Sequence, residues 1–290
     1  MWKSRKILSA FKIAATVTLL SGCTAAGSQE FQLYNQAYDA QYTQGDVVLT
    51  ALAKAERNVF SSVQTSQSLS ERFQPNQAVY FVDSADPPMT ASIRRSLRAV
   101  KAYNDAMSAL ANGESAAALT LRINSFASET VGAIAATTAV IGNPAVSVGA
   151  KALATGLKAS LDAIPIVKEF ANVASREAFR EKLIASYPQV DGILLKVRDE
   201  GTPVIFAYLQ EELITVGDQS SRGGIPDKSI PVLEQDRKML SGWVLLLDQT
   251  RSSLKAAKTA ATARTTVNLA NLTNAAIELR VTAEQVKGSQ

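Results

Sequence analysis

The sequence predicts an all-α protein, an elongated antiparallel bundle of about five to seven helices with a long C-terminal helix. Alanine supplies much of the 47% apolar content, whereas aromatic residues make up only 6%, and alanine is the best helix former. Apolar residues recur at helical spacing over long stretches that glycine and proline separate. The one short run typical of a strand, residues 79–82, has no second strand to pair with. Long helices without strand partners favour a bundle.

Two helices are expected before residue 113. The first covers residues 30–66, with Gly45-Asp46 as a potential break. The second carries a continuous apolar stripe, and Asn112-Gly113 ends it as a C-cap and turn. The stripe consists of Ile93, Leu97, Val100, Tyr103, Met107 and Leu110.

A helical hairpin is expected next. Its first arm is a helix over residues 114–141, and Gly142-Asn143-Pro144 forms the tight break. Asn143 suits the N-cap of the following helix and Pro144 suits its first position. That following helix continues to about Tyr187, with a kink or break at Pro165.

The C-terminal third is expected to hold two short helices and one long helix. Gly201-Thr202-Pro203 separates the short helices, at residues 189–200 and 203–216. Residues 217–231, rich in glycine and proline, form a loop. The last helix covers residues 231–286, about 80 Å at 1.5 Å per residue. Its apolar stripe thins to alanine and threonine between residues 255 and 266, so either a partner helix approaches closely there or the helix is exposed.

The N-terminus carries a compact signal. Lys3, Arg5, Lys6 and Lys12 precede a short apolar run that ends in Leu20-Ser21-Gly22-Cys23. The apolar run is too short to span a bilayer as a helix. Cys23 is the single cysteine of the chain, so no intramolecular disulfide can use it. This segment resembles the signal and lipobox of bacterial lipoproteins.

The resemblance implies how the chain is divided and where it resides. Residues 1–22 are a cleaved signal peptide, residues 23–29 a lipidated tether carrying diacylglycerol and palmitate-type chains on Cys23, and residues 30–290 a single helical-bundle domain. Two or three acyl chains anchor a protein stably, whereas one does not. The chain is therefore expected in the cell envelope. Because Thr24 rather than aspartate follows the cysteine, sorting rules favour the periplasmic face of the outer membrane in a cell with two membranes.

Cleavage also changes the charge balance. The whole chain has 30 Lys+Arg against 26 Asp+Glu, and the segment removed holds four basic residues and no acidic residue. The mature chain therefore has 26 of each sign and a net charge of zero. The basic isoelectric point belongs to the precursor, so we expect no nucleic-acid partner.

Nothing in the sequence forms a catalytic constellation. The chain has no histidine, which removes the commonest general base and metal ligand, and the one thiol belongs to the lipobox. We therefore predict no catalytic residue, no metal and no cofactor. Asp191, Asp199 and Glu200 are interleaved with Lys196 and Arg198, which is typical of a solvated helix face with ion pairs one turn apart. A hydrolase that uses unlinked carboxylates stays open as a third class of function.

One segment is a candidate for contact with a membrane or a partner. Residues 130–150 contain no charge and are rich in small residues. One interpretation is close helix packing within the core, helped by Gly132, Ala136 and Gly149. The other is membrane insertion, because the layout is similar to that of α-helical pore-forming toxins, although each arm is too short to span a bilayer unaided. The candidate residues are Ile134, Val140, Ile141, Gly142, Asn143, Pro144 and Val146.

These observations together predict a lipid-anchored binding or scaffold protein of the envelope. We expect it to meet the membrane through its N-terminal lipid and to bind a protein partner, with no evident small-molecule substrate. The alternative is a membrane-active helical protein that uses the hairpin at residues 130–150.

Overall fold

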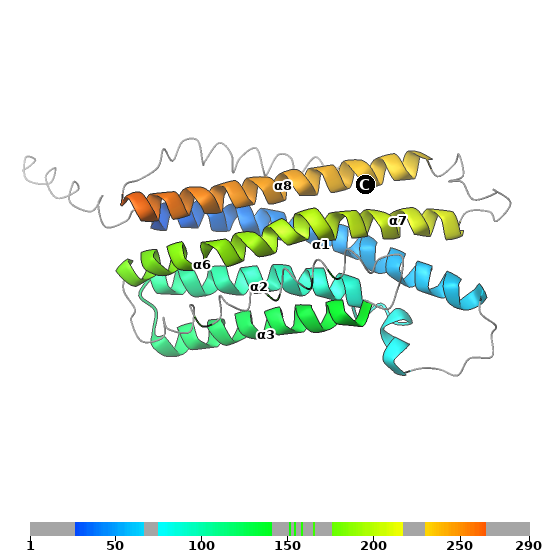
Figure 1. The fold of residues 1–290 in the computed structure, drawn as a ribbon, viewed down its shortest axis with the longest axis horizontal. Coiled ribbons are helices and arrows are strands. Elements are labelled where there is room, and N and C mark those ends of the chain that lie inside the picture. The colour runs from blue at the N-terminus through cyan, green and yellow to red at the C-terminus, as the bar shows by residue number, and fades with distance from the viewer. Residues whose placement is uncertain are drawn as a thin grey trace, which may run out of the picture.

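The computed structural model describes residues 27–66, 75–140, 176–216 and 230–264, together with the isolated helical positions Lys151, Ala154, Lys158 and Pro165. Within these ranges the protein is an all-α bundle without strands (Figure 1). The long helices are α1 (Ser28–Ser66), α2 (Pro88–Ala111), α3 (Ala116–Val140), α6 (Arg176–Lys196), α7 (Thr202–Val216) and α8 (Ile230–Ala263). The predicted fold class is confirmed.

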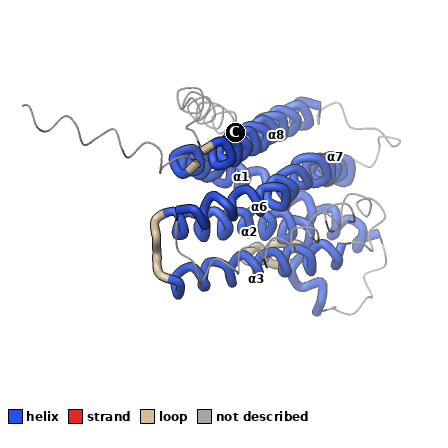
Figure 2. The backbone as a smooth tube through the Cα atoms, turned by 60° about the vertical axis from the view of Figure 1, so that its left-hand side comes forward, coloured by secondary structure: helices blue, strands red, loops and turns tan. Residues whose placement is uncertain are grey.

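The helices run roughly along one long axis. α1 and α8 lie side by side, α6 and α7 form the middle of the bundle, and α2 separates them from α3 (Figure 2). Each of the six long helices contributes to one apolar core. Its largest buried side chains include Trp243 of α8 and the aromatic residues Phe31, Tyr34 and Tyr38 of α1.

α1 is continuous across Gly45, so the predicted potential break is not used. Gly45 instead allows a close approach between helices. A Cβ atom at this position would lie 3.2 Å from Nε1 of Trp243 and 3.4 Å from Cδ1 of Leu97. α1 also begins at Ser28, two residues before the predicted start at Glu30.

The run at residues 79–82 is not a strand. Residues Pro75–Tyr80 form a 3-10 helix, η1, that leads toward α2. The Tyr80 ring stacks on Phe60 of α1 with 4.0 Å between ring centroids, and Phe81 packs edge-on against Phe60. Aromatic contacts with α1 therefore decide the conformation of a segment whose composition suits a strand.

α2 and α3 agree with the sequence analysis. Asn112 caps the end of α2, and Gly113 follows with φ +69°, a left-handed conformation that suits glycine. α3 packs along α2 on the outer side of the bundle (Figure 2).

The predicted break at Tyr187 is wrong. At Gly201-Thr202-Pro203 the predicted helix 203–216 agrees with α7 to within one residue, but the chain stays helical across the predicted stop. α6 passes through Pro188, and its last residue is followed at once by a π-helical turn, η3 (Val197–Gly201), and then by α7. With the Gln189 amide turned so that its nitrogen faces the backbone, it donates to the carbonyls of Ala185 and Ser186 at 3.1 Å, near the carbonyl that the proline leaves without an N–H donor. The backbone N–H of Thr202 donates to the carbonyl of Val197, which closes the wide turn. The chain therefore stays helical past both prolines, from α6 through η3 to α7.

The last helix is not continuous past Arg264, and the rest of its predicted extension, residues 265–286, lies outside the described residues. α8 ends at Ala263, and Arg264 has φ 56°, the left-handed conformation that terminates helices. At 34 residues α8 is still long. Of the two alternatives for its alanine-rich end, the structure has the close approach, because Ala257, Ala260 and Ala261 are buried. A Cβ atom on Gly27 would lie 3.0 Å from Cβ of Ala261.

Candidate functional site

Most residues of the predicted sites lie outside the described ranges. These are the lipidation residue Cys23 and the hairpin residues Ile141, Gly142, Asn143, Pro144 and Val146. Val140 is the last residue of α3, and its side chain is not described. Ile134 is partly buried and packs against the core, whereas Val131 is 56% exposed.

The first arm of the hairpin approaches α2 closely. The Arg95 side chain of α2 crosses the backbone of Gly132, where a Cβ atom would lie 3.0 Å from its Cζ. The contact is made by the Arg95 side chain, and the second arm of the expected hairpin lies outside the described residues. The outer face of α3 exposes two large apolar side chains, Leu121 at 72% and Val131 at 56%.

The end of the bundle at Gly27 is fixed by contacts among three helices. Gly27 has φ +88°, which suits glycine, and its N–H donates to Oε2 of the buried Glu30 at 2.9 Å. Arg180 of α6 donates from Nε and Nη2 to the carbonyl of Ala261, at 3.3 and 3.1 Å. Because Gly27 packs on Ala261, α1, α6 and α8 meet at this end.

Glu56 of α1 is a buried carboxylate that contacts the start of α2. It accepts hydrogen bonds from the N–H groups of Met89 and Thr90, at 2.9 and 3.0 Å, and from the Thr90 hydroxyl at 3.0 Å. Burial raises its pKa from an ordinary 4.5 to about 7, against the lowering effect of these bonds and of Arg57. The carboxylate thus caps α2, whose own N-cap residue, Pro87, has no side-chain donor or acceptor.

The acidic cluster near residue 191 connects two helices. Asp191 of α6 receives bonds from Nε and Nη2 of Arg251, at 2.8 and 3.0 Å. Arg198 similarly donates to both oxygens of Asp248, at 2.6 and 3.0 Å. Of the pairs expected within one helix, Lys196–Glu200 forms, at 3.4 Å. The predicted solvated face is therefore corrected for Asp191 and Arg198, which pair with α8.

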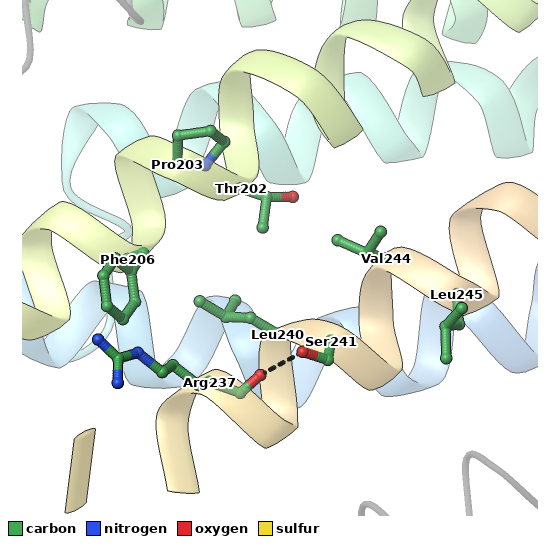
Figure 3. A pocket seen from close by; sticks show the side chains of 8 residues that line it. All are labelled: Thr202, Pro203, Phe206, Arg237, Leu240, Ser241, Val244 and Leu245. Carbon is green, nitrogen blue, oxygen red and sulfur yellow. Dashed lines mark hydrogen bonds between the residues drawn. The ribbon is translucent and has the colours of Figure 1, made fainter. Parts of the chain in front are cut away.

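A groove of about 570 Å³ lies between α7 and the first half of α8 (Figure 3). Its walls are mostly apolar, and Arg237 is its charged residue. The Arg237 guanidinium lies over the Phe206 ring, 5.6 Å from the ring centroid. The lining residues are Thr202, Pro203, Phe206, Arg237, Leu240, Ser241, Val244 and Leu245.

Sequence reasoning missed this groove, although a signal was present. Residues 243–247 are five consecutive apolar residues in a helix, and five successive positions extend around more than one turn. One core cannot cover them all. Trp243 and Leu247 are fully buried, whereas Leu245 is 60% exposed at the edge of the groove.

Comparison with protein-family models, with curated proteins and with solved structures gives no match for this chain. No helix in the described ranges combines the length and apolarity needed to cross a membrane. Within the same ranges, no three His, Cys, Asp or Glu side chains are grouped as a metal ion would require.

Proposed function

We propose that this protein is an envelope lipoprotein, anchored through Cys23, whose helical bundle acts as a binding or scaffold module. The observation that carries the proposal is the short stretch of chain between the lipobox and the clamped end of the bundle. Cys23 precedes Gly27 by four residues, and extended chain spans at most about 3.5 Å per residue. The lipid is therefore attached within about 14 Å of Gly27.

This short connection supports an oriented anchor. Gly27 is bonded to Glu30 and packs on Ala261, so the tether joins a rigid part of the fold. The groove is centred near Ser241, 20 residues from Ala261 and thus about 30 Å away along α8. Anchoring at Cys23 holds the Gly27 end toward the bilayer and leaves the groove end further along the bundle. In a cell with two membranes, Thr24 favours the outer membrane as its location.

Metabolic labelling tests the anchor. Cells that express the wild-type chain, Cys23→Ser or Ser21→Ala are supplied with labelled palmitate. Wild type incorporates the label, and so does Ser21→Ala, because it keeps a small residue before the cysteine. Cys23→Ser incorporates none and retains the 22-residue signal segment. Palmitate on Cys23→Ser would overturn the proposal.

Crosslinking in the native envelope tests the scaffold role. A scaffold is expected to give a discrete crosslinked partner, identified by mass spectrometry, that also co-purifies with the wild-type chain. Recovery of the uncrosslinked monomer alone would count against this role.

A second candidate function is membrane activity through residues 130–150. The observation that favours it is Val131 of α3, which lies within the uncharged segment and is 56% exposed. A helix face of this kind can enter the interfacial region of a bilayer without spanning it. Ile134 contacts the core, so Val131 is the cleaner position at which to test this function.

Dye release from liposomes separates the two functions. The unlipidated protein is added to neutral and anionic vesicles, with Val131→Asp compared against Val232→Asp, an exposed valine of α8. Membrane activity predicts release that Val131→Asp abolishes and Val232→Asp preserves. Intact vesicles at micromolar protein exclude this function and agree with the scaffold.

A further inference from the structure

We propose that the groove between α7 and α8 binds a single-chain amphiphile with an anionic head group, of the long-chain fatty acid class. Its carboxylate contacts Arg237, and its alkyl chain lies along the apolar wall toward Leu245. This inference goes beyond the proposed anchor, because the groove takes its ligand whether or not Cys23 carries lipid.

The polar groups of the groove define the head-group end. Ser241 donates its hydroxyl to the carbonyl of Arg237 at 2.7 Å, and Thr202 donates to the carbonyl of Val197 at 3.4 Å. Both hydroxyl groups therefore already bond to backbone. Arg237 is the charged group among the lining residues, so a complementary ligand has one anionic end.

Arg237 is available to such a ligand. Its partner among the acidic groups is Glu234, at 3.9 Å, and both side chains are more than half exposed. An exposed pair at this distance contributes at most about 1 kcal/mol, so a ligand carboxylate can replace it. Phe206 holds the guanidinium at the groove, and Figure 3 shows both side chains at the same end of the site.

The other end of the groove suits an alkyl chain. Leu240, Val244 and Leu245 follow Arg237 along α8 (Figure 3). Leu245 lies eight residues beyond Arg237, about 12 Å along the helix axis. Its 60% exposure leaves apolar surface that contact with an alkyl chain would remove from water.

The size of the groove favours a small amphiphile over a protein. A volume of about 570 Å³ falls within the range of small-molecule sites. Its eight lining residues are far fewer than the roughly 20–30 residues that each partner contributes to a standard protein interface.

Photoaffinity labelling tests the proposal. The full chain carrying Cys23→Ser, which has no lipid of its own, is titrated with palmitic acid that bears a diazirine in its alkyl chain. After irradiation, mass spectrometry maps the attachment sites. We expect saturable labelling concentrated on residues 202–206 and 237–245.

Matched variants separate the two ends of the ligand. Leu245→Asp is expected to weaken labelling of the groove about tenfold, the effect of losing one apolar contact, whereas Leu121→Asp, at an exposed leucine of α3, leaves it unchanged. Arg237→Gln weakens labelling by the acid but not by its uncharged methyl ester. Lys238→Gln, next to Arg237 but outside the groove, changes neither.

Three outcomes would overturn the proposal. The first is labelling spread over the exposed apolar side chains of α3 or confined to the signal segment. The second is groove labelling that Leu245→Asp does not reduce while circular dichroism shows the variant folded. The third is an absence of saturable labelling, which would leave the groove to a peptide partner or to none. Loss of palmitate incorporation at Cys23 in cells bears on the anchor alone, so the two proposals fail separately.

Discussion

At the scale of single residues, Glu56 shows how one helix begins with help from another. α2 starts at Pro88, which suits the first turn because its missing N–H needs no partner there. The next two N–H groups would be left unpaired, and Glu56 of α1 accepts both. Burial makes the charged carboxylate costly, so its pKa rises to about 7.

The raised pKa predicts how stability depends on pH. Between pH 4.5 and 7 the folded state keeps a proton on Glu56 that the unfolded state has lost. The contribution of Glu56 to the free energy of unfolding is therefore complete below about pH 4.5 and is lost as pH rises through 7. Glu56→Gln removes the titration. Its stability relative to wild type should rise by about 2–3 kcal/mol between pH 5 and 8, at about 1.4 kcal/mol per pKa unit. Urea unfolding at both pH values measures this difference, and parallel pH profiles would contradict it.

At the scale of elements, two glycines inside helices differ in whether a side chain would fit at their position. Gly45 in α1 lies against the Trp243 indole, so its missing side chain lets two helices approach. Gly192 in α6 has no atom within 4 Å of the position its Cβ would take. Glycine is about 1 kcal/mol less favourable than alanine inside a helix. A substitution by alanine gains this free energy only where the added methyl group fits the packing.

Alanine substitutions at these two glycines should therefore have opposite effects. Gly192→Ala should stabilise the protein by up to about 1 kcal/mol, because it gains helix propensity without a steric contact. Gly45→Ala should destabilise it by about 1–2 kcal/mol, because displacing Trp243 in a packed core outweighs the same gain. Thermal unfolding followed at 222 nm gives the sign of each change. If both substitutions stabilised the protein, the Trp243 side chain would have moved away from residue 45 at little cost in free energy.

At the scale of the whole molecule, the six long helices share a single core. Core residues come from Phe31 at the start of α1 to Ala261 near the end of α8. The ion pairs of Arg251 with Asp191 and of Arg198 with Asp248 add links from α8 to α6 and to η3. The described helices bury their apolar side chains against one another in this shared core. They are therefore expected to unfold together.

A single cooperative transition is therefore predicted for the mature chain. With the cleavage before Cys23 that we propose, Trp243 is the one tryptophan of the mature chain, and this side chain is fully buried and lies against Gly45 of α1. Tryptophan fluorescence and helical circular dichroism should give the same midpoint in urea. A fluorescence change that precedes the loss of helix would divide the bundle into separate units.

Several elements could be predicted because their signals are local. The apolar stripe of α2 and its Asn112-Gly113 end depend on spacing and on one left-handed glycine, both readable in the chain. Pro188 misled prediction because α6 continues through it, and Pro203 because a π-helical turn keeps the chain helical just before it. The apolar run at 243–247 signals surplus apolar surface on the last helix, but the groove itself joins residues from two helices whose relative position the sequence does not encode locally.

By itself the sequence determined the all-α class and the resemblance of residues 20–23 to a lipobox. These depend on residue type and spacing over short distances. Only the tertiary structure decided that Gly45 is a contact, that Glu56 caps α2 and that Leu245 borders an open groove. The physical reason is that burial and partners are properties of the packed chain, and the same residue type has a different role once its neighbours are known.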